Sequence, residues 1–210
     1  MKNTFSKGFT LVELLIVITI LAALAAAVVV VLNPAELLAQ ARDAQRMSDM
    51  TTLRDAINLH ISQVSTPLLC GGTVASPGTC PVGGRCTIAA VPPANMPFAG
   101  ATACTVPAAA DLRLVTNVGW VSVRFTDMPG GAPIATLPVD PVNSITFFYA
   151  YRADTTNNTF RLATRLESAR HREMMRNDGG PDSACGPIGA HTWTTADCFF
   201  EVGTNMAAAL

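Results

Sequence analysis

The chain has 210 residues, of which half are hydrophobic and only 14% are charged, and its formal net charge at pH 7 is −1. A fully soluble protein rarely keeps so few charged residues, so the composition indicates a membrane-facing surface. It excludes a coiled-coil rod, a polytopic transporter and a continuous disordered chain, and it excludes nucleic acid as a default partner because no basic excess is present to neutralise phosphates.

The N-terminal end combines a basic leader with a long apolar segment. Lys2 and Lys7 are the only lysines, and they stand where the positive-inside rule places cations beside a spanning helix. Residues 14–32 are nineteen positions without a charge, which as a helix cover about 28 Å, close to the hydrocarbon thickness of a bilayer. A secretory signal cleaved within residues 22–27 is the alternative, but the apolar run continues beyond them. The sequence therefore predicts one membrane-spanning helix.

A short motif lies between the leader and the apolar segment. In chain order its residues are Lys7, Gly8, Phe9, Thr10, Leu11, Val12 and Glu13. In this order and with these flanks they resemble the processing site of type IV pilins and pseudopilins. The resemblance implies that a prepilin peptidase cuts after Gly8 on the cytoplasmic side, which makes residues 1–8 a cleaved leader, and that Phe9 is then N-methylated. A glycine before the cut suits a protease, because without a Cβ the backbone can be approached closely.

Glu13 is a carboxylate at the edge of the apolar segment. At the centre of a spanning helix a carboxylate costs about 2.5–3.5 kcal/mol on insertion scales, and less near an end. Glu13 is therefore either solvated at the interface or paired with a cation that assembly supplies. The resemblance implies a role in assembly, in which Glu13 pairs with the new amine at Phe9 of a neighbouring subunit. Methylation of that amine keeps its charge.

Helix-forming residues continue over residues 34–62. Apolar residues recur there at spacings of three and four and form one stripe, namely Met47, Met50, Leu53, Ile57 and Ile61. Charged residues lie off the stripe, namely Arg42, Arg46, Asp49 and Asp55. Pro34 removes a backbone donor and clashes with the preceding turn, so we expect one bent helix over residues 9–62 with a kink at Pro34. The alternative is a first helix that ends at Asn33 and a second that begins at Pro34.

Residues 63–110 are rich in cysteine, proline and glycine and are predicted to form a long connecting loop. A loop of this length is usually functional or cross-linked. Zinc is the weaker explanation, since the loop contains no Cys-x-x-Cys pair and no nearby histidine. An export signal with six cysteines favours three disulfides formed in an oxidising compartment. The four cysteines of the loop, which allow three pairings, are Cys70, Cys80, Cys86 and Cys104.

Residues 111–210 are predicted to form a head built on an antiparallel sheet. The predicted strands, which alternate in polarity or are rich in aromatic residues, are residues 120–125, 145–151 and 159–166. Turn-forming residues 154–158 join the last two strands as a hairpin, and the prolines of residues 137–143 make that segment a loop. With Tyr149 and Tyr151, this layout resembles the head domain of bacterial pilins.

The C-terminal segment contains Cys185 and Cys198. The resemblance implies that these two cysteines close a loop onto the sheet, as a disulfide does in many pilins, whereas a calcium ion serves there in the major pseudopilins of type II secretion. Asp178 and Asp182 raise that alternative, but a complete calcium-loop pattern is absent and two carboxylates in a glycine-rich turn are more often turn formers. We expect neither a metal nor a cofactor.

Catalytic motifs are absent from the sequence. Its histidines, His60, His171 and His191, are far apart, and no nucleophile elbow, phosphate loop or His-Glu-x-x-His motif occurs. His60 stands near the apolar stripe and is expected to be packed or interfacial rather than to act as a base. We expect a protein that is not an enzyme.

Together these segments predict an α+β protein. A long N-terminal helix packs on a C-terminal head, which is built on an antiparallel sheet and has loops stapled by disulfides. Residues 9–33 are the membrane-spanning, filament-core half of the helix and residues 34–62 its amphipathic half. The resemblance implies a structural subunit of a type IV pilus or pilus-like surface filament. A pseudopilin of type II secretion or DNA uptake and a minor tip adhesin are the alternatives.

The resemblance also implies the partners and the location. The partners are further copies of the chain in a helical polymer, the prepilin peptidase and N-methyltransferase, and an assembly platform with its ATPase. The chain is expected first as a single-pass protein of the cytoplasmic membrane with its head outside, and afterwards in an extracellular or periplasmic filament.

Overall fold

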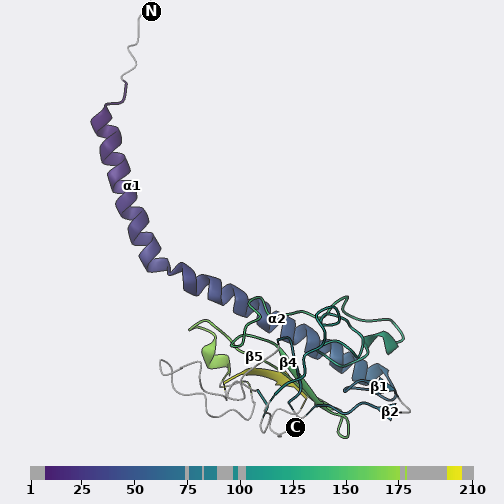
Figure 1. Ribbon diagram of the computed structural model, residues 1–210. Helices are drawn as coiled ribbons and strands as arrows, with labels where there is room; N and C mark the ends of the chain where they lie inside the picture. The colour runs from purple at the N-terminus through teal and green to yellow at the C-terminus, as the bar shows by residue number, and fades with distance from the viewer. Residues whose placement is uncertain are drawn as a thin grey trace, which may run out of the picture. The chain divides into compact units, whose positions relative to one another are not determined.

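The computed structural model describes residues 8–73, 76–81, 83–88, 97–98, 103–175, 178 and 198–204. The chain divides into two compact units, Met1–Leu38 and Ala39–Leu210. The first contains helix α1 and the first turn of α2, and the second contains the rest of α2 and the head. Figure 1 shows the two helices in succession, followed by the head.

Two helices form where we expected one bent helix. Helix α1 (Leu11–Leu32) ends at Asn33, whose φ of 40° lies in the left-handed region that asparagine tolerates. Helix α2 (Pro34–Gln63) begins directly afterwards, with Pro34 at its first position, where a missing N–H costs nothing. The carbonyl of Asn33 accepts the N–H groups of Glu36 and Leu37 at 3.0 and 3.3 Å. The expectation of a continuous helix is therefore wrong, and the alternative that places the break at Asn33 describes the backbone.

Helix α2 packs on one face of the head through the predicted apolar stripe. Met50, Leu53 and Ile57 are fully buried in a core that also contains Phe160 and Leu162 of the sheet. Burying a side chain of this size stabilises a protein by about 1.5–3 kcal/mol. The stripe thus fixes α2 to the head, as the amphipathic pattern predicts.

The head contains a four-stranded antiparallel sheet in the order β3-β4-β5-β6. Its strands are β3 (Arg85–Cys86), β4 (Ala150–Asp154), β5 (Thr159–Thr164) and β6 (Phe200–Gly203). The predicted hairpin is confirmed: β4 pairs with β5 in a register that places Tyr151 opposite Leu162. Asn158, with a φ of 51°, lies in the turn between them. Residues 145–149, which we expected in the strand, precede it as irregular chain, and β3 and β6 were not predicted.

The predicted strand over residues 120–125 is wrong. Almost the whole segment is buried, so its alternation does not mark a solvent face; the buried residues are Trp120, Val121, Ser122, Val123 and Phe125. Its backbone bonds are irregular, since the N–H of Trp120 donates to Leu112 at 3.4 Å and that of Phe125 to Val115 at 3.1 Å. A short 3-10 helix, η2 (Phe125–Asp127), follows.

The other face of the sheet carries a second, smaller core. Ala150 of β4 and Ala163 of β5 pack there with Phe148 and Phe199. The rings of Phe148 and Phe199 meet edge to face with their centroids 6.1 Å apart. The described part of the head also contains the ribbon of β1 (Gly72–Thr73) with β2 (Ser76–Pro77) and the 3-10 helix η3 (Arg172–Met175).

Candidate processing and assembly site

The Gly8–Phe9 bond lies outside helix α1. The helix begins at Leu11, and Thr10 is its N-cap residue, with an extended backbone at φ −84° and ψ 150°. An added Cβ at Gly8 meets nothing within 4 Å, and the Phe9 side chain is exposed. The bond that the peptidase is expected to cut is therefore neither wound into the helix nor covered by the rest of the described chain.

Thr10 and Glu13 form a reciprocal capping box that we did not anticipate. The N–H of Glu13 donates to Thr10 Oγ1 at 3.2 Å, while the N–H and the hydroxyl of Thr10 donate to Glu13 Oε2 at 2.9 and 2.8 Å. Each side chain thus satisfies a backbone donor that the first turn of a helix leaves unpaired. The pattern of a threonine followed three residues later by a glutamate was available in the sequence as a signal of this box.

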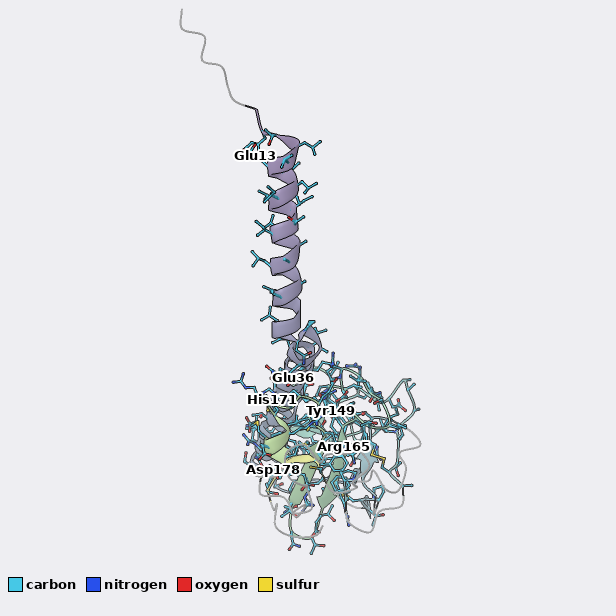
Figure 2. The ribbon with its side chains drawn as sticks, turned by 90° about the vertical axis from the view of Figure 1, so that its left-hand side faces the viewer. Glu13, Glu36, Tyr149, Arg165, His171 and Asp178 are labelled. Atoms are coloured by element: carbon cyan, nitrogen blue, oxygen red, sulfur yellow. A yellow bond between two sulfur atoms is a disulfide. The ribbon has the colours of Figure 1, made fainter. Side chains whose placement is uncertain are left out.

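Helix α1 presents an apolar surface on every side. Within it the stretch Leu11–Val28 is long and apolar enough to cross a membrane, and none of it is buried against the rest of the chain. Figure 2 shows apolar side chains projecting all around the helix, with Glu13 at its N-terminal end. Glu13 is the only charged residue of α1. A helix that is apolar all round requires lipid or other protein segments around it.

The cysteines of the connecting loop pair with near neighbours in the chain. Cys70 is joined to Cys80 and Cys86 to Cys104, with Cα–Cα distances of 4.9 and 5.8 Å. This is one of the three pairings that the sequence left open. Closing loops of 10 and 18 residues stabilises a fold by about 3 kcal/mol each in the chain-entropy model.

We expect all six cysteines to be oxidised in the exported protein. Non-reducing peptide mapping should recover Cys70 with Cys80, Cys86 with Cys104, and Cys185 with Cys198. Cys198 is disulfide-bonded, whereas Cys185 lies outside the described residues, so this last pairing stays a prediction. Free thiols throughout, or a crossed pairing of the first four cysteines, would contradict the arrangement.

A group of charges around the buried Arg46, which we call the Arg46 cluster, joins α2 to the head. Its members are Arg42, Asp43, Arg46, Asp140 and Glu167. The side chain of Arg46 is 0% exposed; its Nε donates to Asp140 at 2.6 Å and its Nη1 to Asp43 at 2.8 Å. Burial alone would lower the pKa of Arg46, but the bonds to Asp140 and Asp43 raise it above the ordinary value. Arg46, which we placed off the apolar stripe, is therefore buried against the head all the same.

Two carboxylates of the Arg46 cluster, Asp43 and Asp140, also hold loops. Asp43 accepts the backbone N–H groups of Glu167 and Ser168 at 2.8 and 2.7 Å, just after β5. Asp140 accepts those of Val142 and Asn143 at 2.8 and 3.0 Å, within the predicted loop 137–143. The cluster thus connects α2 to two segments of the head that are remote from it in sequence.

Glu167 and Asp49 take part in two further polar contacts between α2 and the head. Arg42 donates to both oxygens of Glu167 and lowers its pKa. Asp49 accepts the hydroxyl of Tyr149 at 2.8 Å, and burial raises the pKa of both groups. Of the charged residues that we placed off the apolar stripe, Asp49 is therefore also turned toward the head.

Ser168, His171 and Asp43 lie together but do not form a catalytic relay. Ser168 Oγ and Asp43 Oδ2 both face the same ring nitrogen of His171, Nδ1, at 3.1 and 3.7 Å. In a hydrolytic triad the serine and the carboxylate engage opposite ring nitrogens. Ser168 is moreover fully buried. The geometry indicates a packing contact at the end of β5.

His60 and Asp178, two further residues singled out in the sequence, make packing and backbone contacts within the head. His60 is buried, its ring meets Phe125 edge to face at 6.1 Å, and burial lowers its pKa. Asp178 Oδ2 accepts the N–H of Glu201 on β6 at 2.6 Å. Within the described residues no group of three or more His, Cys, Asp or Glu could hold a metal ion. Asp182 and His191 lie outside those residues.

Comparison with known proteins gives one match. Neither a curated protein nor a solved structure matches the chain. A family model described as the prokaryotic N-terminal methylation motif matches residues 4–29, which include Gly8, the Thr10–Glu13 capping box and most of α1. This motif supports the interpretation of the chain as a type IV pilin-like or pseudopilin protein. It marks a structural family, and it implies processing by a prepilin peptidase. Residues 4–29 thus carry the N-terminal methylation motif, which is the prepilin signal of type IV pilins and pseudopilins.

Proposed function

We propose that the chain is a structural subunit of a type IV pilus or pilus-like surface filament, processed by a prepilin peptidase and polymerised through α1. This proposal rests on one observation: the methylation motif at residues 4–29 overlaps a helix that is apolar on every side. The disulfides of the connecting loop fit a head that is exported to an oxidising compartment.

The proposed mechanism begins with a precursor anchored in the cytoplasmic membrane by α1. Cleavage after Gly8 creates a cationic amine at Phe9, and its methylation keeps that charge. An assembly platform with its ATPase then lifts the subunit so that α1 leaves lipid and packs among the α1 helices of other copies. Because lipid is as apolar as leucine, hydrophobicity alone does not drive this step. Helix packing, contacts between heads and the pairing of Glu13 with the Phe9 amine of a neighbour supply the driving force.

The test of processing is the mass of the mature N-terminus. We expect it at Phe9, heavier by one methyl group. Gly8→Leu should accumulate as an uncut precursor that still inserts, because a Cβ then blocks the approach of the protease. Gly130→Leu is the matched control, since an added Cβ at Gly130 also meets nothing within 4 Å but lies in the head; it should be processed normally. A mature N-terminus within residues 22–27 would contradict the proposal.

The test of the filament is the location of the processed chain. Abundant surface fibres composed of this chain support the proposal. Short periplasmic filaments together with neighbouring secretion genes would favour a pseudopilin instead, and a substoichiometric position at fibre tips would favour a minor adhesin.

A further inference from the structure

His60 is a buried polar side chain in the last turn of α2. The residue is 1% exposed, and its ring packs edge to face on Phe125 of η2 with the ring centroids 6.1 Å apart. Among the described residues neither ring nitrogen has a hydrogen-bond partner. A neutral imidazole in this position has already given up its hydrogen bonds to water, and an imidazolium would in addition bring a charge into the core.

Two effects favour the charged form of His60. The C-terminal end of α2 is the negative end of the helix dipole, and Asp127 of η2 is the charged group of the described residues that attracts a cation at His60. The Asp127 side chain, however, is 38% exposed and lies 3.9 Å from Arg124, so its charge is screened by water and shared with a second cation. Burial is the larger effect, and it lowers the pKa of His60. The packed structure therefore accepts the neutral ring.

We propose that the contact between His60 and Phe125 is an acid-sensitive latch, which holds the C-terminal turn of α2 on the head at neutral pH and releases it when His60 is protonated. This inference goes beyond the proposed function and does not depend on it. The latch adjoins the start of the connecting loop, because the carbonyl of His60 accepts the N–H of Val64 at 3.0 Å.

The direction of the pH effect follows from the two states of the latch. In the released state the ring meets water, and the pKa of His60 returns to its ordinary value of 6.5. The released state therefore binds a proton more readily than the closed state. The closed state keeps its full stability above pH 6.5 and loses stability as the pH falls from there through the lowered pKa of the buried ring. Because one proton is involved, the equilibrium constant for release rises by at most about tenfold per pH unit.

The experiment is amide hydrogen exchange of the full-length chain in detergent micelles at pH 7.5 and 5.5, with rates corrected for the pH dependence of exchange in an unfolded chain. The amides of Val64 and Met128 report on the two sides of the latch, since they donate to the carbonyls of His60 and Phe125 at 3.0 and 3.3 Å. In the wild type we expect the protection of both amides to fall several-fold at pH 5.5.

Two histidine variants separate the latch from other acid effects. His60→Leu keeps an apolar side chain against Phe125 but cannot bind a proton, so its protection should be the same at both pH values. His171→Leu is the matched control, because His171 is another histidine of the head whose ring lies 3.1 Å from Ser168 Oγ; it should show the wild-type fall.

A second measurement needs no variant to fold. In the wild type, nuclear magnetic resonance of the His60 ring protons should show that the closed protein keeps the ring neutral at pH 6.0. Titration of the His60 ring with an ordinary or raised pKa in the folded protein overturns the proposal, as does wild-type protection that is equal at both pH values. An equal fall in His60→Leu also overturns it. None of these outcomes depends on cleavage, methylation or filaments, so the latch and the proposed function can fail separately.

Discussion

Replacing Arg46 with methionine is expected to lower the free energy of unfolding of the head by about 3–5 kcal/mol. The substitution keeps the length and packing of the side chain but leaves Asp43 and Asp140 buried without their countercharge. Both carboxylates retain backbone donors, yet hydrogen bonds alone do not replace the lost cation. Since small proteins are stable by only about 5–15 kcal/mol, this change is a large part of the total.

The measurement is urea unfolding of the full chain in detergent micelles, followed by near-UV circular dichroism. Arg54→Met is the matched control on the same helix, because the Arg54–Asp55 pair is solvent-exposed, with side chains 40% and 61% exposed. Exposed pairs contribute about 0.2–1 kcal/mol. In the double variant Arg46→Met/Asp140→Asn the loss should be smaller than the sum of the single losses, because one stranded charge is removed. Equal effects of Arg46→Met and Arg54→Met on the free energy of unfolding would show that the Arg46 cluster contributes no more to stability than an exposed ion pair does.

Replacing Glu13 with alanine is expected to abolish filaments while leaving the precursor inserted and cleaved. The leader and Gly8 are unchanged, so the peptidase still finds its substrate, although methylation is expected to fall if the methylating enzyme reads this end. Removal of a carboxylate from an apolar helix favours membrane insertion. In the proposed filament, however, the cationic amine of Phe9 would enter a core of α1 helices without a partner, and breaking a buried pair in this way costs about 3–5 kcal/mol.

The measurement for Glu13 is the ratio of sheared fibres to membrane-pool protein in Glu13→Ala and Glu13→Asp. Aspartate keeps the charge but is one methylene shorter, so its fibre yield should lie between those of the wild type and the alanine variant. Fibres at the wild-type level with alanine at position 13 would mean that the carboxylate is merely solvated at the membrane interface and has no role in assembly.

Local patterns in the sequence were sufficient to predict the helical residues and the central hairpin, but not the break between the two helices at Asn33. Helix α1 follows from an uninterrupted apolar run, and the buried stripe of α2 follows from the spacing of Met50, Leu53 and Ile57. The β4–β5 hairpin follows from a turn cluster between two β-prone segments. In each of these cases the interactions that decide the structure lie close together in the chain.

Long-range packing explains the failures. The alternation over residues 120–125 suited a half-buried strand, but every residue of the segment except Arg124 is buried, and it pairs with no strand among the described residues. The strands β3 and β6 are short and become strands only through pairing with β4 and β5. Arg46 has the side chain of a solvent-facing residue, and its burial depends on Asp140, which is 94 residues away.

The candidate site was predictable in part. Gly8, Phe9 and Glu13 follow from the motif, and the family-model match covers the same residues. The capping contact of Thr10 was missed because the motif directs attention to Glu13 as an intermolecular group, whereas its first partner lies three residues earlier in its own chain.

The buried face of α2 has a mechanical consequence. Its buried residues extend from Ala39 to His60, which along a helix axis is about 32 Å. Tension along α2 therefore loads the charged contacts at Arg46 and the apolar contacts at Leu53 and Ile57 in parallel, as shear, instead of peeling them apart one after another. Rupture in shear requires many contacts to fail together, so the attachment of the head to its helix is suited to carrying a pulling force.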